Sequence, residues 1–191
     1  MKKILFMALM IATTIIPANG QEINIPEPEF ADQGYIFTAY DEPQLLIREN
    51  AYVKIKRNTG VSILISPLLA RARSFYRMEG KESPIHVSRI NAPIQLIIKC
   101  TDNNTDPAAY INILKFEIKG KRREYLSASA NITGAKAKNN AMLPFTAKKY
   151  GASSYLITIT DPEPGEYAIQ IGNPTATTNK NSLSFLTFGI K

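Results

Sequence analysis

Apolar and polar residues alternate with a period of two through most of this chain after residue 34. Such alternation is typical of strands that bury one face, because successive side chains of a strand point to opposite sides. The clearest case is segment 93–101, in which one face holds Ile94, Leu96, Ile98 and Cys100. Spacing typical of a helix is nowhere sustained beyond roughly two turns. The pattern therefore predicts a β-rich domain with Cys100 in its core.

Turn-forming residues separate the predicted strands at short intervals. Gly120-Lys121 predicts a hairpin between 109–119 and 122–129, and Asn58-Thr59-Gly60 is expected to join 52–57 to 62–66. The other predicted strands are 70–80, 93–101, 154–160, 166–172 and 182–190, with surface loops at 129–142 and 173–181. About ten short strands without crossover helices predict an all-β, antiparallel β-sandwich. We expect a single domain over 34–191, preceded by an extended acidic lead-in at 21–33.

The first 20 residues have the three parts of a cleaved secretory signal peptide. Lys2 and Lys3 precede an uncharged apolar run, and Ala18 and Gly20 supply small residues before the expected cut. The run is shorter than the roughly 20 residues that span a bilayer, so no transmembrane anchor is expected. Cys100 is the only cysteine, which excludes a disulfide within the chain and fits a bacterial exported protein. The expected location is the periplasm or the cell surface.

Charge is distributed unevenly along the chain. The formal net charge is +7, yet residues 21–47 hold six acidic residues and no Lys or Arg. The rest of the chain is therefore strongly basic and could attract anionic polymers. For an exported protein, anionic glycans and lipid headgroups are more accessible than nucleic acid, which we do not expect as a partner. The alternative is that the charge only keeps the surface soluble.

One predicted strand carries the strongest candidate binding surface. By parity, Arg71, Arg73, Phe75 and Arg77 share a face of segment 70–80, over about 20 Å of strand. Guanidinium groups bind carboxylates, phosphates and sulfates bidentately, so this face is a candidate site for an anionic glycan. The same pattern of arginines equally fits a solvent-exposed sheet face on which they form ion pairs with acidic residues of a neighbouring strand.

A second basic cluster lies at the tip of the predicted 109–129 hairpin. Its members are Lys119, Lys121, Arg122 and Arg123. Hairpin tips commonly carry charge for solubility, so this cluster is the weaker candidate for binding an anion.

A proline–glycine turn precedes the predicted strand 166–172. Pro164-Gly165 is followed by Tyr167, and this arrangement resembles the tyrosine corner of immunoglobulin-like and fibronectin type III sandwiches. The resemblance implies an immunoglobulin-like sandwich in which the Tyr167 hydroxyl bonds to upstream backbone where the chain crosses between sheets. The sequence lacks the cysteine pair and tryptophan of antibody domains, so the resemblance concerns architecture alone.

The wider layout is similar to that of uncharacterised secreted β-sandwich proteins of Bacteroidetes-type bacteria. The similarity rests on a basic strand ending in Gly80-Lys81-Glu82-Ser83-Pro84, on Phe116-Glu117-Ile118-Lys119, and on Pro164-Gly165-Glu166-Tyr167 before a final Phe188-Gly189-Ile190. It implies an exported compartment and a fold, and it carries no activity.

Signatures of metal or catalytic chemistry are few. Segment 102–106 resembles the first half of a calcium loop, but Pro107 replaces the turn glycine and Ile113 the bidentate glutamate. His86 is the only histidine, so a Ser-His-Asp arrangement would have to use it, and one histidine with one cysteine cannot build a usual zinc site. No metal and no cofactor are expected. Paired carboxylates suited to glycoside hydrolysis stay open, because their pairing is spatial.

The sequence therefore predicts an exported, non-catalytic β-sandwich protein that acts in binding or assembly at the bacterial cell envelope. Its leading form is an adhesion or assembly module that meets another envelope protein through a sheet face or an exposed edge strand. One alternative is a binder of anionic glycans or lipid headgroups through the basic face of 70–80. A second alternative is a small secreted hydrolase that uses paired carboxylates.

Overall fold

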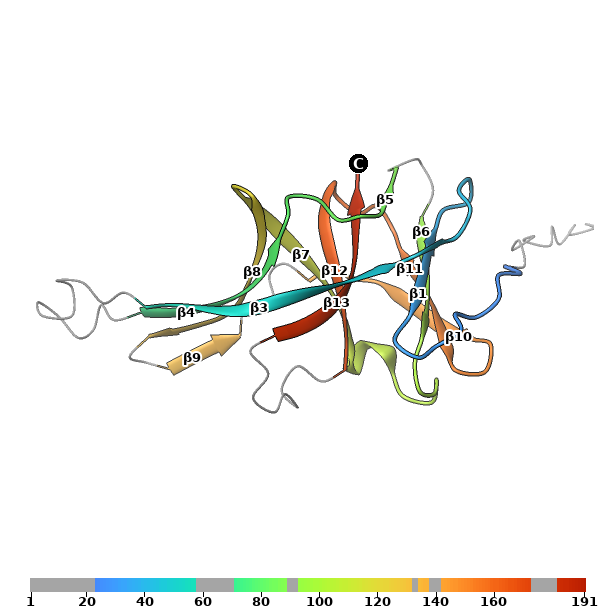
Figure 1. Cartoon of the computed structure of the whole chain (residues 1–191). Helices are drawn as coiled ribbons and strands as arrows, with labels where there is room; N and C mark the ends of the chain where they lie inside the picture. Colours follow the sequence, from blue (N-terminus) through green and yellow to red (C-terminus); the bar gives the residue numbers. More distant parts are fainter. Residues whose placement is uncertain (1–22, 58–70, 89–92, 132–133, 138–141, 173–181) are drawn as a thin grey trace, which may run out of the picture.

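The computed structural model describes residues 23–57, 71–88, 93–131, 134–137, 142–172 and 182–191, which form thirteen strands in two sheets (Figure 1). The first sheet has five strands, in the order β10 (Thr146–Tyr150), β11 (Ser154–Ile159), β6 (Ile94–Lys99), β1 (Gly34–Phe37) and β2 (Gln44–Leu45). The second has eight strands, in the order β12 (Gly165–Ile171), β7 (Ile111–Lys119), β8 (Arg122–Asn131), β4 (Arg71–Glu79), β3 (Ile47–Arg57), β13 (Ser182–Ile190) and β5 (His86–Val87), with β9 (Gly134–Ala137) paired to β8. A short 3-10 turn at Pro107–Ala109 precedes β7.

The second sheet closes on itself. β12 pairs with β13 from Gly165↔Ile190 to Ile169↔Leu186, so β12, β7, β8, β4, β3 and β13 form a six-stranded barrel. All pairings are antiparallel except that of β13 with β5. The expected all-β, antiparallel class is confirmed, but one of the two sheets is closed into a barrel where the sequence predicted a β-sandwich. Alternation indicates which face of a strand is buried, but it does not indicate which strands pair along their edges. It therefore cannot reveal that a sheet closes into a barrel.

Two large hydrophobic cores fill most of the described part of the molecule. The first lies between the five-stranded sheet and one wall of the barrel, where Leu96 and Ile98 of β6 meet Tyr167 and Phe188. The second fills the inside of the barrel and is built from Met78, Phe116, Tyr125 and Phe185, with several aromatic neighbours in contact. The Phe116 ring centroid lies 5.8 Å from that of Tyr125 and 6.1 Å from that of Phe185. The inside of this small barrel is therefore packed with side chains, as is usual at this size.

Most strands were predicted from the sequence. Segments 70–80, 93–101, 154–160, 166–172 and 182–190 correspond to β4, β6, β11, β12 and β13, and the 109–129 hairpin to β7 and β8. The prediction that 129–142 is a loop is wrong in part, because β8 runs to Asn131 and β9 follows. Segment 52–57 belongs to β3, which pairs with β4 and β13, while its expected partner 62–66 and the loop 173–181 lie outside the described residues.

The acidic lead-in is held against the outer side of the five-stranded sheet. Ile23 and Ile25 pack on a small third cluster formed by Phe37, Ile97 and Leu156. The Tyr150 hydroxyl accepts a hydrogen bond from Ile25 N at 3.2 Å. We call residues 23–27 the strap, because they cross this sheet without joining it as a strand.

Glu27 ties the strap to the turn between β10 and β11. Its carboxylate accepts hydrogen bonds from Ala152 N at 3.1 Å and Ser153 N at 3.0 Å. The approach is so close that a Cβ on Gly151, whose φ is +55°, would lie 2.3 Å from the Glu27 carboxyl carbon. The turn therefore needs glycine both for its backbone angle and for the space that Glu27 occupies.

We predict that Glu27→Gln lowers the free energy of unfolding near pH 7 by about 1 kcal/mol. The Ser154 hydroxyl and the backbone N–H groups of Ser153 and Ala152 outweigh desolvation and hold the pKa of Glu27 below its usual 4.5. Because the folded pKa is the lower one, this stabilisation is present above about pH 4.5 and is lost as pH falls through the folded pKa. Urea denaturation near pH 7 and near pH 3 should show a larger difference at the higher pH. Glu29→Gln is the matched control, and an equal loss at both pH values would contradict the prediction.

Candidate functional site

The predicted basic strand is β4, and its odd-numbered residues from Arg73 onward face outward. Tyr76 and Met78 of this strand pack in the barrel core, so Arg73, Phe75 and Arg77 lie on the other side. We call this side of β3, β4 and β8 the outer face. Arg71 is the Cα partner of Asn131, and its side chain lies outside the described part of the structure.

Arg77 is neutralised by an acidic residue of the neighbouring strand. Its guanidinium forms an ion pair with Glu124 of β8, and both side chains are nearly buried. Glu124 also accepts from Arg122 at 2.7 Å and lies 3.7 Å from the Lys56 ammonium. Burial raises the pKa of Glu124, but hydrogen bonds from Arg122 and Arg77 outweigh this effect and the net shift is downward. Arg77 therefore belongs to an ion-pair network within the sheet.

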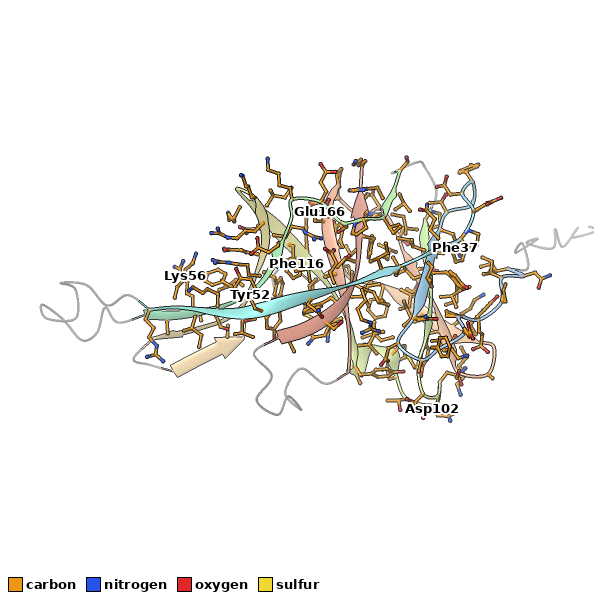
Figure 2. All side chains as sticks on the ribbon, viewed as in Figure 1. Phe37, Tyr52, Lys56, Asp102, Phe116 and Glu166 are labelled. Atoms are coloured by element: carbon orange, nitrogen blue, oxygen red, sulfur yellow. The ribbon has the colours of Figure 1, made fainter. Side chains whose placement is uncertain are left out.

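The residues next to this network keep an excess of positive charge. Lys56 of β3 is the Cα partner of Arg73, and Lys54 that of Phe75. Lys56 and Tyr52 mark this part of β3 in Figure 2. Within the described residues, Lys54 and Arg73 form no ion pair, and both are exposed. We call Lys54, Lys56 and Arg73 the cation row.

A β-bulge lies beside the cation row. The pairing of β4 with β8 shifts in register between Ser74 and Phe75, which leaves Ser127 of β8 without a Cα partner on β4. The Ser127 hydroxyl donates to Ser74 O at 3.0 Å. A bulge bends its strand and changes the direction of nearby side chains. Here it lies between free Arg73 and neutralised Arg77.

The β7–β8 hairpin does not bring the second basic cluster together. Lys119 forms an exposed ion pair with Glu117 at 2.7 Å, Arg122 contacts Glu124, and Lys121 is exposed. Arg123 points into the barrel and is only 1% exposed. Successive residues of a strand face opposite sides, so the cluster is divided between the surface and the interior.

Buried Arg123 is the centre of a polar cluster that closes one end of the barrel, and sequence reasoning did not find it. Arg123 donates to Glu49 Oε1 at 2.7 Å and to Ser83 Oγ at 2.7 Å. Glu166, labelled in Figure 2, accepts from Ser83 N and Ser83 Oγ, both at 2.6 Å. Thr187 donates to the other oxygen of Glu49 at 2.5 Å. We call these residues the barrel-end cluster. Its only sequence signal is a charged residue at an inward position of a strand.

His86 lies at the rim of the barrel-end cluster. Its Nε2 is 3.3 Å from Glu166 Oε1 and 3.8 Å from Glu82 Oε2. The ring sits directly over β13, where a Cβ on Gly189 would lie 2.3 Å from His86 Cδ2. His86 therefore contacts carboxylates, while Cys100 lies apart in the core between the sheets. Burial raises the pKa of the Cys100 thiol.

The acidic residues of the turns at 102–106 and 163–166 form hydrogen bonds and ion pairs within the fold. Glu163 contacts Lys115 at 2.5 Å, whereas Glu166 points into the barrel-end cluster. Asp102, labelled in Figure 2, accepts from Asn104 N at 2.8 Å, and Asp106 accepts from Ala108 N at 3.0 Å. Among the described residues, no group of three His, Cys, Asp or Glu side chains could hold a metal ion.

The proline–glycine turn stands where the chain passes from one sheet to the other. β11 belongs to the five-stranded sheet and β12 to the barrel. The Tyr167 hydroxyl donates to Glu163 O at 2.6 Å, across Pro164 and Gly165. The Tyr167 ring is buried and stacks on Phe188 with a centroid distance of 5.5 Å. This corner fixes the path of the chain between the two layers.

Comparisons with protein-family models, with curated proteins and with solved structures find no match to this chain. In the described part of the chain, no helix has the length and apolar character needed to cross a membrane.

We predict that Arg123→Met destabilises the fold by roughly 3–5 kcal/mol, because it leaves two inward-facing carboxylates without their cation. The matched control is Arg122→Met, which removes the same group from the next residue, whose side chain is 39% exposed. Urea denaturation of both variants checks the prediction. Equal losses for the two would show that the barrel-end cluster does not depend on Arg123.

Proposed function

We propose that this protein is an exported, non-catalytic binding protein of the bacterial cell envelope whose outer face meets an anionic partner. The observation that carries the proposal is the cation row. Lys56 and Arg73 lie directly opposite each other on adjacent strands, a placement of like charges that destabilises a sheet. Natural sequences tend to break such local rules where function requires it. An anionic partner would relieve this repulsion.

The roles of the other polar groups support binding rather than catalysis. Arg77 and Glu124 neutralise each other, and Arg123, Glu49 and Glu166 do so inside the barrel. Both sets of charged groups have structural partners, and the barrel interior is packed with aromatic rings. Among the described residues of this face, Lys54 and Arg73 form no ion pair, and the exposed Lys56 reaches Glu124 only at 3.7 Å, so these three cations are the charges most available to a partner.

The compartment and the architecture are parts of the same proposal. The leader at 1–20 supports export, and we expect the mature chain to begin at Gln21. The corner at Tyr167 supports an immunoglobulin-like arrangement of the five-stranded sheet and the barrel wall that faces it.

A second candidate function is assembly with another envelope protein through the edge strand β10. Among the described strands, β10 pairs only with β11, and residues 146–149 are exposed. An extended segment of a partner could add to such an edge through main-chain hydrogen bonds. Lys148 and Lys149 are also the kind of residue that protects an edge from unwanted pairing.

We predict that the full chain, expressed in a bacterial host, is recovered outside the cytoplasm without residues 1–20. Cell fractionation followed by mass spectrometry of the intact protein is the measurement. Recovery from the cytoplasm with the leader attached would overturn the proposed compartment. Chemical cross-linking of the same envelope fraction tests β10, since a specific protein partner linked through Lys148 or Lys149 would favour assembly.

We predict that the mature protein is retained on immobilised heparin at low salt and that Lys54→Ala with Arg73→Ala weakens binding roughly tenfold. Both residues are exposed, so the double variant should fold normally. Lys81→Ala with Lys191→Ala removes the same charge elsewhere and should have little effect. Equal weakening in the two double variants would mean that net charge, and not the outer face, causes retention.

A further inference from the structure

We propose that the outer face binds an extended polysaccharide that carries carboxylate or sulfate groups, with Lys54, Lys56 and Arg73 as its contacts. This inference rests on the proposed function, because it names the class of partner for the same face.

The cation row is spread over two strands and cannot be satisfied by one small anion. Lys56 and Arg73 are directly opposite each other, which places their Cβ atoms about 5 Å apart. Lys54 lies two residues from Lys56 along β3, about 7 Å away. A ligand that presents several anionic groups along a chain can reach all three charges. A polymer with one charged group per sugar unit has this form.

Arg73 is the residue best suited to hold such a group. Its exposed guanidinium can bind a carboxylate or a sulfate through two parallel hydrogen bonds. Its Cα partner on β8 is Ser129, whereas the Cα partner of Arg77 on the same strand is Glu124. One arginine is therefore neutralised within the sheet, and the other is left for a ligand.

Aromatic and hydroxyl groups surround the cations. The Lys56 ammonium lies 4.8 Å from the centroid of the Phe75 ring, which is half-buried. The Tyr52 ring is 37% exposed, and its hydroxyl contacts Glu79 Oε1 at 3.2 Å. The face thus offers hydrogen-bonding and aromatic surface beside positive charge, which suits a ligand with many hydroxyl groups.

The same surroundings disfavour a membrane. Proteins that bind a bilayer surface usually add inserted apolar side chains to a basic patch. The exposed aliphatic residue of this part of β3 is Ile55, at 54% exposure. Ile55 lies between Lys54 and Lys56 in sequence and therefore points to the opposite side of the strand. On the outer face itself, the aliphatic neighbour of the cation row is Leu126 of β8, which is the Cα partner of Phe75 and is half-buried, so it projects less than an exposed apolar anchor would.

The test compares four anionic probes by isothermal titration calorimetry or co-sedimentation at moderate salt. They are heparin, polygalacturonate, inorganic polyphosphate and vesicles of phosphatidylglycerol, with neutral dextran as the uncharged control. The proteins are the mature wild type, Lys54→Ala with Arg73→Ala, and Lys81→Ala with Lys191→Ala. We expect heparin or polygalacturonate to bind at least about tenfold more tightly than polyphosphate and vesicles, with most of this lost in the first variant only.

The outcomes separate the polysaccharide inference from the more general proposal that the outer face binds an anionic partner. Binding of vesicles or polyphosphate as tightly as the polysaccharides overturns the polysaccharide inference and leaves an anion-binding outer face standing. Polysaccharide binding that survives Lys54→Ala with Arg73→Ala overturns the assignment of these residues. Absence of binding to all four anionic probes overturns the proposed function as well.

Discussion

The fold depends on two strands, β12 and β13, that are buried on both sides. Tyr167 and Phe188 face the five-stranded sheet, while Ala168 and Phe185 face the inside of the barrel. Because these strands pair with each other, they form a wall that both cores share. Each core is therefore shaped by the same backbone, and packing changes in one are transmitted to the other through a closely packed layer. The corner at Tyr167 sets where this wall begins.

The sequence predicted the longer strands well, including β12 and β13, and missed the shortest ones. β6 and β7 could be recognised because Lys99 and Lys115 mark a side that is only partly buried. β1, β2 and β5 are two to four residues long, too short for a period to be visible. The closure of the barrel depends on the hydrogen bonds between β12 and β13, which no local pattern records. β9 lies within a predicted loop for a similar reason: it is a strand because it pairs with the end of β8, and the local sequence does not record this pairing.

The sequence predicted which strand carries the candidate site, but it did not predict which of its arginines form ion pairs. Parity correctly indicates that Arg73 and Arg77 share a side of β4, because that depends on one strand alone. Arg77 is ion-paired and Arg73 is not because the residues opposite them on β8 are Glu124 and Ser129, respectively. This difference is set by the register between strands that are distant in the sequence. The bulge at Ser74 changes that register further. For the same reason the barrel-end cluster could not be foreseen, because Glu49, Arg123 and Glu166 come from three strands far apart in the sequence.

The strap has a practical consequence for the orientation of the molecule. Ile23 and Ile25 fasten the first described residues to the outer side of the five-stranded sheet, while the ends of β3 and β4 project at the opposite end of the molecule (Figure 1). The last residue, Lys191, lies instead beside Glu82 at the closed end of the barrel. A label or support attached ahead of the strap would therefore leave β3, β4 and β8 turned away from the attachment point and open to large ligands. Attachment after Lys191 would place the label or support next to Glu82 and the barrel-end cluster.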